Sequence, residues 1–144
     1  MRVNRLFFIV LIIFTTNTFA EPETGSLVVT FTGFSSADGK LAISIWDSEE
    51  IFLSKSKAPF RSANLAIIQP NTQWTVESLP YGKYAISVYQ DENNNNDLDT
   101  NFFGVPDEPY GFSNNVQGSF GPPSFEQASF IMESTNTVIK IKLN

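Results

Sequence analysis

The sequence predicts an all-β protein, a single antiparallel β-sandwich of about seven strands, and two observations carry this prediction. Seven short segments of the 144-residue chain alternate apolar and polar residues, the pattern of strands that bury one face. Pro, Gly, Asn and Asp lie in most of the intervals between these segments, and no segment sustains a helical period. Short alternating strands separated by turns are typical of a sandwich.

The predicted strands are, in chain order, 26–32, 40–47, 63–68, 72–78, 83–90, 127–132 and 136–143. The first two are the clearest, because each places three apolar residues at alternate positions, and Asp38-Gly39 between them favours a tight turn. Pro70-Asn71 separates the third and fourth strands. The last strand alternates apolar residues with lysine, so that one face is buried and the other is solvated. Residues 48–57 are compatible with one short helical turn.

The first twenty residues have the features of a cleaved signal peptide. Arg2 and Arg5 supply positive charge, and Leu6–Phe14 is a nine-residue apolar stretch. Thr18-Phe19-Ala20 then places small residues at the positions that precede a cleavage site. An uncleaved anchor is the alternative, but nine apolar residues are far fewer than the roughly 20 that span a bilayer.

We therefore expect a signal peptide at 1–20, a short linker at 21–25 and one β-sandwich domain at 26–144. The mature domain is expected to be exported, either to the periplasm or to the outside of the cell. It is not expected to span a membrane, since no second apolar run is present in the sequence.

The composition excludes several classes of site. The chain has no cysteine and no histidine, so disulfides and Ser-His-Asp or Cys-His catalysis are excluded, and zinc, haem and copper sites are not expected. Without Arg2 and Arg5, 7 Lys and Arg remain against 15 Asp and Glu, a net charge of −8. Such a field repels phosphate backbones, so nucleic acid is not expected as a partner. Between Lys83 and Lys140 the carboxylates have no cation near them in sequence.

Residues 91–99, DENNNNDLD, place oxygen-bearing side chains at alternate positions. Counted from the first aspartate, the run meets the first three positions of the EF-hand pattern D-x-[DN]-x-[DN]. Calcium takes six to eight oxygen ligands, and a chain that curls around the ion turns every second side chain inward. The sequence therefore predicts a calcium site, with Asp91, Asn93, Asn95, the Asp97 carbonyl and Asp99 as ligands.

Two positions depart from a complete EF-hand. Asn96 stands where glycine is usual, although asparagine tolerates the left-handed conformation that the turn needs. Phe102 stands where a bidentate glutamate is usual, so the missing carboxylate would have to come from Asp107 or Glu108. We therefore expect weak affinity, about 10⁻⁴–10⁻³ M. The alternative is a solvated polar turn, since Asn and Asp are common in turns.

Residues 91–125 form a long connection, for which we predict an ordered loop. Connections above about 15 residues are usually functional or disordered, and this one is rich in aromatic residues, which disordered segments lack. The candidate partner-binding residues are Phe102, Phe103, Tyr110 and Phe112. The alternative is that these rings fill a small core within the loop. Trp46, Phe52 and Trp74 are expected to be core residues.

Two motifs resemble those of known families. Leu79–Tyr84, LPYGKY, resembles the LxPGxY stretch of transthyretin-like and carboxypeptidase-regulatory-like domains, which implies an immunoglobulin-like or transthyretin-like sandwich. The long loop, with DENNNNDLDTN, GVPDEPYGFSN and FGPPSFEQASF, resembles a family of exported bacterial proteins known as domain of unknown function 2141. The resemblance covers about residues 25–144 and implies the same architecture and export, but no particular activity. Asn94 and Asn96 stand where that family usually has glycine, and Gln90 where histidine is frequent.

Two functions are compatible with these features. The first is a non-catalytic binding or structural module, in which a calcium-ordered loop presents aromatic rings to an unknown protein or glycan partner. The second is a carboxylate-dependent hydrolase acting on glycans, with candidates Asp91, Asp99, Asp107, Glu108 and Glu126. Such chemistry needs two carboxylates about 5–10 Å apart, and nothing in the sequence selects a pair. We therefore predict the binding module and assign no catalytic residue.

Overall fold

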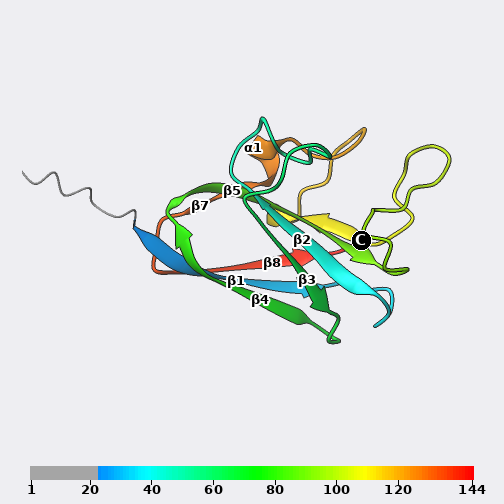
Figure 1. The fold of residues 1–144 in the computed structure, drawn as a ribbon, viewed down its shortest axis with the longest axis horizontal. Coiled ribbons are helices and arrows are strands. Elements are labelled where there is room, and N and C mark those ends of the chain that lie inside the picture. The colour runs from blue at the N-terminus through cyan, green and yellow to red at the C-terminus, as the bar shows by residue number, and fades with distance from the viewer. Residues whose placement is uncertain (1–22) are drawn as a thin grey trace, which may run out of the picture.

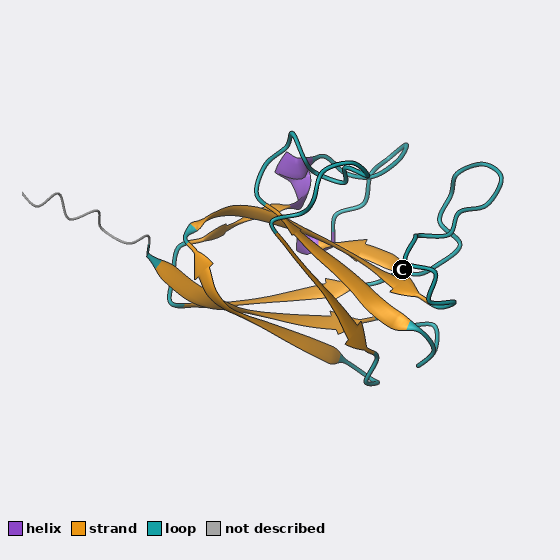
Figure 2. Ribbon diagram, viewed as in Figure 1, coloured by secondary structure: helices purple, strands orange, loops and turns teal. Residues whose placement is uncertain are grey.

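The computed structural model describes residues 23–144, and the predicted signal peptide lies outside the described residues. The strands are β1 (Thr24–Thr32), β2 (Lys40–Trp46), β3 (Arg61–Ala66), β4 (Thr72–Pro80), β5 (Gly82–Asp91), β6 (Tyr110–Phe112), β7 (Ser129–Met132) and β8 (Asn136–Lys142). A 3₁₀ turn, η1 (Ser113–Asn115), and one helical turn, α1 (Phe125–Ala128), complete the elements. The strands form two layers that face each other (Figures 1 and 2). The prediction of an all-β sandwich is confirmed.

The two sheets differ in size and in strand direction. The smaller sheet has the order β4-β1-β8, and the larger has the order β3-β2-β5-β6. β5 is long enough to pair with β7 along its first half and with β6 along its second half. The pairing is antiparallel throughout except between β1 and β8, which are parallel. The sandwich is therefore antiparallel as predicted, except for this one pair.

The main core lies between the sheets and follows the predicted alternation. Leu27, Val29 and Phe31 of β1 are fully buried, and the inward residues of β2 and β5 face them. Burying one such side chain stabilises the fold by about 1.5–3 kcal/mol, so a single polar substitution on this face would be costly. The residues of β2 and β5 that point away from this core lie on the outer face of the larger sheet.

A helical turn shortens one predicted strand. The Ser124 hydroxyl accepts a hydrogen bond from the Gln127 amide, and the Gln127 side chain accepts one from the Ser124 amide, 3.2 Å and 2.9 Å long. This reciprocal capping box starts α1, so β7 begins at Ser129 instead of at residue 127. The connection predicted at 91–125 also contains β6 and η1. β6 was not predicted, because a three-residue strand is too short to show alternation.

A second apolar cluster covers part of the outer face of the larger sheet. Its buried members are Trp46, Ala85, Phe112, Phe125 and Ala128. Figure 1 shows α1 and the neighbouring loops on the side of β2 and β5 that faces away from β1 and β4. Trp46 and Phe52 therefore pack, at 6.1 Å between ring centroids, in this second cluster and not between the sheets, whereas Trp74 packs against the main core. Within residues 23–144 no helix is long and apolar enough to cross a membrane.

Candidate functional site

The outer face of the larger sheet carries a groove of about 700 Å³ beside the second apolar cluster. Strands β2, β5 and β6 supply its floor, and the loops 47–60, 92–109 and 116–124 supply its walls. These loops rise from one side of the sheet in Figure 2. The volume lies within the range of about 300–1,000 Å³ that is typical of small-molecule sites.

The register of the strands arranges the floor in rows. Ser44 is paired with Ser87, which is paired in turn with Phe112, and Tyr89 is paired with Tyr110. Residues paired across neighbouring strands point to the same face, so two hydroxyls and three rings form one surface. The Trp46 indole nitrogen donates a hydrogen bond of 2.9 Å to the Ser87 hydroxyl, which leaves that hydroxyl free to donate to a ligand.

The groove gathers three of the four predicted partner-binding residues. Phe103, Tyr110 and Phe112 line it, with Phe112 buried in the floor and Phe103 86% exposed on the wall. Phe102 is 97% exposed and packs edge-on against Phe103 at 5.6 Å, but it is not part of the lining. Phe120 on the opposite wall is also fully exposed. Apolar rings this exposed around a groove are typical of an interaction site.

The acidic run forms a closed loop beside the groove. The carboxylate of Asp91 is fully buried and accepts hydrogen bonds from the Asn95 and Asn96 amides, 3.0 Å and 2.9 Å long. Asn94 and Asn96 have φ of +62° and +66°, the left-handed conformation that their usual glycines would adopt. The asparagines at these two positions therefore permit the same turn.

Three side chains of the run meet inside this loop. The amide nitrogen of Asn93 lies 2.5 Å from Asp99 Oδ2, and that of Asn95 lies 2.9 Å from Asp99 Oδ1. The side-chain oxygens of both asparagines also accept backbone amides, from Asn95 and Asp97 respectively. The Asp97 side chain is largely exposed and accepts a hydrogen bond from the Leu98 amide. The side chains of Asn93, Asn95 and Asp99 thus lie together, with their oxygens already in hydrogen bonds.

Glu108 joins the two ends of the loop. Its carboxylate is buried and accepts hydrogen bonds from the Glu92 amide at 2.9 Å and the Asp99 amide at 3.0 Å. The chain folds back on itself here, and the Asp107 amide donates a hydrogen bond to the Asp99 carbonyl at 2.9 Å. The Asp107 residue itself is exposed. Glu108 therefore lies at the base of the loop, where it satisfies two backbone donors.

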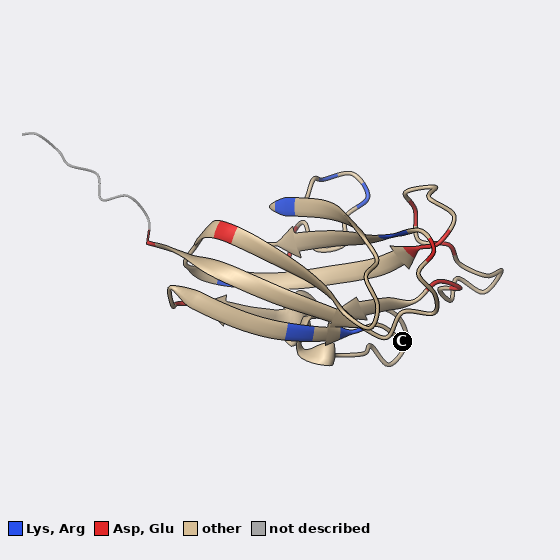
Figure 3. Cartoon of the chain, turned by 90° about the horizontal axis from the view of Figure 1, so that it is seen from below, with Lys and Arg blue, Asp and Glu red and all other residues tan. Residues whose placement is uncertain are grey.

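Tertiary contacts supply cations that the local sequence lacks. Lys40 Nζ lies 3.3 Å from the Asp91 carboxylate and donates to the Asn96 side-chain oxygen at 2.7 Å. Lys55 Nζ lies 3.9 Å from Asp97. Figure 3 shows the acidic positions of this region concentrated at one end of the sandwich. Within residues 23–144, no group of three or more Asp or Glu side chains could hold a metal alone, so an ion here would also need asparagine and backbone oxygens.

The charged loop also affects a phenol in the groove. Burial raises the pKa of Tyr89 above its ordinary value of 10.0, and the negative charges of Asp91, Asp97 and Glu108 raise it further. The Tyr89 side chain is therefore a neutral hydroxyl near neutral pH. It offers the groove both a ring face and a hydrogen-bonding group.

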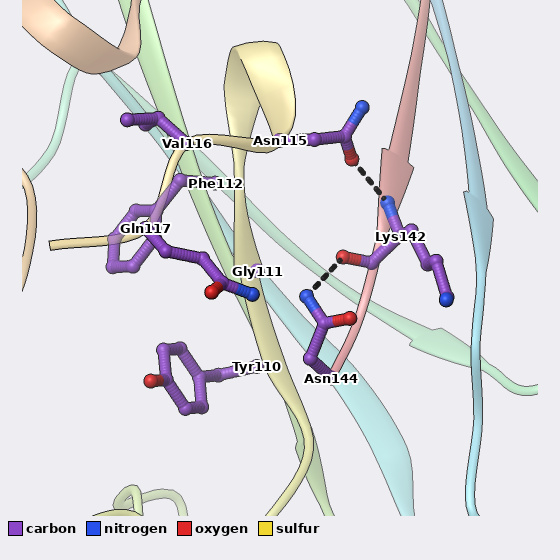
Figure 4. A pocket seen from close by; sticks show the side chains of 8 residues that line it. All are labelled: Tyr110, Gly111, Phe112, Asn115, Val116, Gln117, Lys142 and Asn144. Carbon is purple, nitrogen blue, oxygen red and sulfur yellow. Dashed lines mark hydrogen bonds between the residues drawn. The ribbon is translucent and has the colours of Figure 1, made fainter.

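A second hollow, behind β6, measures about 10 Å³ and is shown in Figure 4. The Asn115 side-chain oxygen accepts a 2.8 Å hydrogen bond from the Lys142 amide, and the Asn144 side chain lies 3.5 Å from the Lys142 carbonyl. The space suits about one water molecule. The Asn115 contact joins the end of β8 to η1.

The motif YGFSN at 110–114 has a structural role as well as a place in the floor. The buried Ser113 hydroxyl accepts the Ile86 amide at 2.8 Å and donates to the Ala128 carbonyl. A Cβ on Gly111 would lie 2.8 Å from the Lys142 carbonyl oxygen, so only glycine fits. These residues hold β6 between β5 and β8 and thereby position Tyr110 and Phe112.

The sequence analysis missed the central part of the floor. Ser44, Ser87 and Tyr89 occupy outward positions of two strands that were recognised, and Trp46 was assigned to the core alone. The signal was present, since an outward row of serine and aromatic residues is unusual for a solvated face. Lys40 was also missed, because only strand pairing brings it to Asp91.

Comparison with known proteins places the chain in a family. The family described as an uncharacterized protein conserved in bacteria, domain of unknown function 2141, matches residues 29–140. Searches of curated proteins and of solved structures gave no match. The matched region includes the acidic loop, the floor of the groove and part of every strand. The chain therefore belongs to the bacterial family known as domain of unknown function 2141, in agreement with the resemblance of its long loop.

Proposed function

We propose that this protein is an exported, non-catalytic binding module that holds a calcium ion in the loop 91–99 and receives a ligand in the adjacent groove. One observation carries the proposal: the acidic loop is also a wall of the groove, through Asp97 and Leu98. An ion that stiffens this loop would therefore fix the wall against which a ligand packs. Pre-ordered walls reduce the entropy that binding costs.

The donor set of the loop is the kind that calcium prefers. It consists only of oxygens, from Asp91, Asn93, Asn95, the Asp97 carbonyl and Asp99. The two asparagine amides would have to release Asp99 before their oxygens could act as ligands. This rearrangement favours weak binding, in the range of about 10⁻⁴–10⁻³ M that is typical of extracellular modules.

The positions of the candidate acids favour binding over hydrolysis. Among the described residues that line the groove, Asp97 is the one carboxylate. Asp91 and Glu108 are buried against backbone amides, and Glu126 lies 2.5 Å from Lys83 on another part of the surface. A glycosidase needs two carboxylates facing one substrate bond. The proposal therefore assigns the groove a binding role.

The proposal of export rests on the predicted signal peptide, and the N-terminus of the mature protein shows directly whether that peptide is removed. Expression of the full chain in a Gram-negative host should give an envelope-fraction protein whose N-terminus, measured by mass spectrometry, follows Ala20. Recovery of the unprocessed chain in the cytoplasm would contradict this part of the proposal.

A thermal melt of the mature chain tests the calcium ion. An ion that binds only the folded state must raise the melting temperature by an amount that grows with its concentration. We expect millimolar calcium to raise it after treatment with EDTA, and magnesium to raise it less. Asp99→Asn should abolish the rise, whereas Glu133→Gln, an exposed acid outside the loop, should retain it. Absence of any rise in the unaltered protein would remove calcium from the proposal.

A further inference from the structure

We propose that the ligand of the groove is a neutral saccharide chain, which stacks its rings on the aromatic side chains and hydrogen-bonds to the hydroxyls among them. This inference rests on the proposed binding role of the groove, but it does not depend on the calcium ion.

The floor offers the two kinds of contact that a sugar ring requires. A pyranose presents a face of C–H bonds, which packs on aromatic rings, and a rim of hydroxyl groups. Tyr89 and Tyr110 are neighbours across two strands, and Ser44 and Ser87 form the next row of the sheet. The row of two phenols therefore lies next to a row that holds two serine hydroxyls and the Phe112 ring, and residues of neighbouring rows on one face of a strand are about 7 Å apart.

The charges of the lining favour an uncharged ligand. The charged side chains among the described lining residues are Lys55 and Asp97, which lie 3.9 Å apart and compensate each other. An anionic ligand would find no unpaired cation in this lining.

The strand pairing argues against an extended peptide as the ligand. A peptide that adds to a sheet needs an exposed strand edge with free backbone groups. The floor lies on the face of β2, β5 and β6, and β5 is paired with β2 on one side and with β6 and β7 on the other. The hydroxyl-bearing floor also differs from the apolar lining that an acyl chain would require.

The fluorescence of Trp46 can report on occupancy of the groove. The chain has two tryptophans, and Trp74 packs against the main core, so the mature Trp74→Phe protein keeps the groove indole as its one tryptophan, which can be excited selectively over the tyrosines. Titration with cellohexaose, maltohexaose and the hexamer of N-acetylglucosamine should give a saturable change with at least one of them. An acidic oligogalacturonate of the same length should give none.

Variants of the lining aromatic residues test the stacking contacts. Phe103→Ala and Tyr89→Ala should each weaken binding about three- to tenfold, as expected for loss of one aromatic contact. Val138→Ala, which truncates an exposed apolar side chain on the other sheet, should leave binding unchanged. Circular dichroism of each variant confirms that the sandwich is intact.

The outcomes separate this inference from the calcium proposal. The inference is overturned if no neutral oligosaccharide alters the fluorescence at millimolar concentration, or if Val138→Ala weakens binding as much as Phe103→Ala. It is also overturned if sedimentation shows that a second copy occupies the groove, or if a peptide library competes where the sugars do not. Saccharide binding that persists in EDTA supports the inference whatever the calcium melt shows.

Discussion

The ammonium of Lys40 lies 3.3 Å from the fully buried carboxylate of Asp91, although 51 positions separate the two residues in the chain. Lys40 begins β2 and Asp91 ends β5, and the two are paired in the antiparallel register. Strand pairing therefore brings a positive charge next to the buried negative charge of Asp91. Lys40 thus neutralises part of the negative charge for which the sequence predicted a calcium ion.

Lys40→Met should weaken the fold and strengthen its response to calcium. Removal of the ammonium leaves the Asp91 carboxylate with two backbone donors, so we expect the free energy of unfolding to fall by about 1–3 kcal/mol in EDTA. Calcium should restore more stability than in the unaltered protein, because the ion no longer competes with the lysine. Urea unfolding with and without calcium measures both effects.

The control for this change is Lys57→Met, which removes the partner of the exposed Glu50. Exposed ion pairs contribute about 0–1 kcal/mol, so this variant should unfold almost as the unaltered protein does. An equal calcium response in the two lysine variants would mean that Lys40 does not share a site with the ion.

Glu108→Gln should loosen the acidic loop without changing its sequence. Glutamine has one acceptor oxygen in place of two, so either the Glu92 or the Asp99 amide loses its partner. We expect a loss of about 1–3 kcal/mol in the free energy of unfolding and faster hydrogen exchange at these two amides. Asp107→Asn alters the exposed neighbouring carboxylate and should have little effect. Unchanged exchange in the Glu108 variant would show that this clamp does not hold the loop.

Tyr89→Phe should reduce the loss of stability at high pH. The pKa of Tyr89 is raised in the folded protein, first by burial and then by the charges of Asp91, Asp97 and Glu108. Above about pH 10 the unfolded chain has lost the phenolic proton while the folded protein retains it, so the free energy of unfolding falls as the pH rises. Urea unfolding at several values between about pH 9 and pH 11 should give a shallower decline for the variant.

Tyr84 supplies an independent comparison for this titration. Burial and the charge of Asp47 raise its pKa as well, while Arg61 lowers it. Tyr84→Phe should therefore also make the decline shallower. A decline of the same slope in Tyr89→Phe and the unaltered protein would contradict the inferred shift at Tyr89.

The strands with clear alternation were predictable from the sequence because side-chain alternation is a local property. Leu27, Val29 and Phe31 face the main core as expected, and the ordered connection after β5 was recognised by its length and aromatic content. β6 escaped prediction because three residues give no period. The parallel pairing of β1 with β8 depends on contacts between the two ends of the domain, which no local pattern encodes.

The sequence by itself determined the all-β class, the inward faces of the strands, the family and the group of oxygen-bearing side chains at 91–99. Each of these follows from residue type and spacing within one segment. The tertiary structure alone decided which outward residues share the groove, that Lys40 lies against Asp91, and that Glu108 accepts amides from both ends of the loop. These relationships depend on strand register and chain reversal, which are set by packing between distant segments.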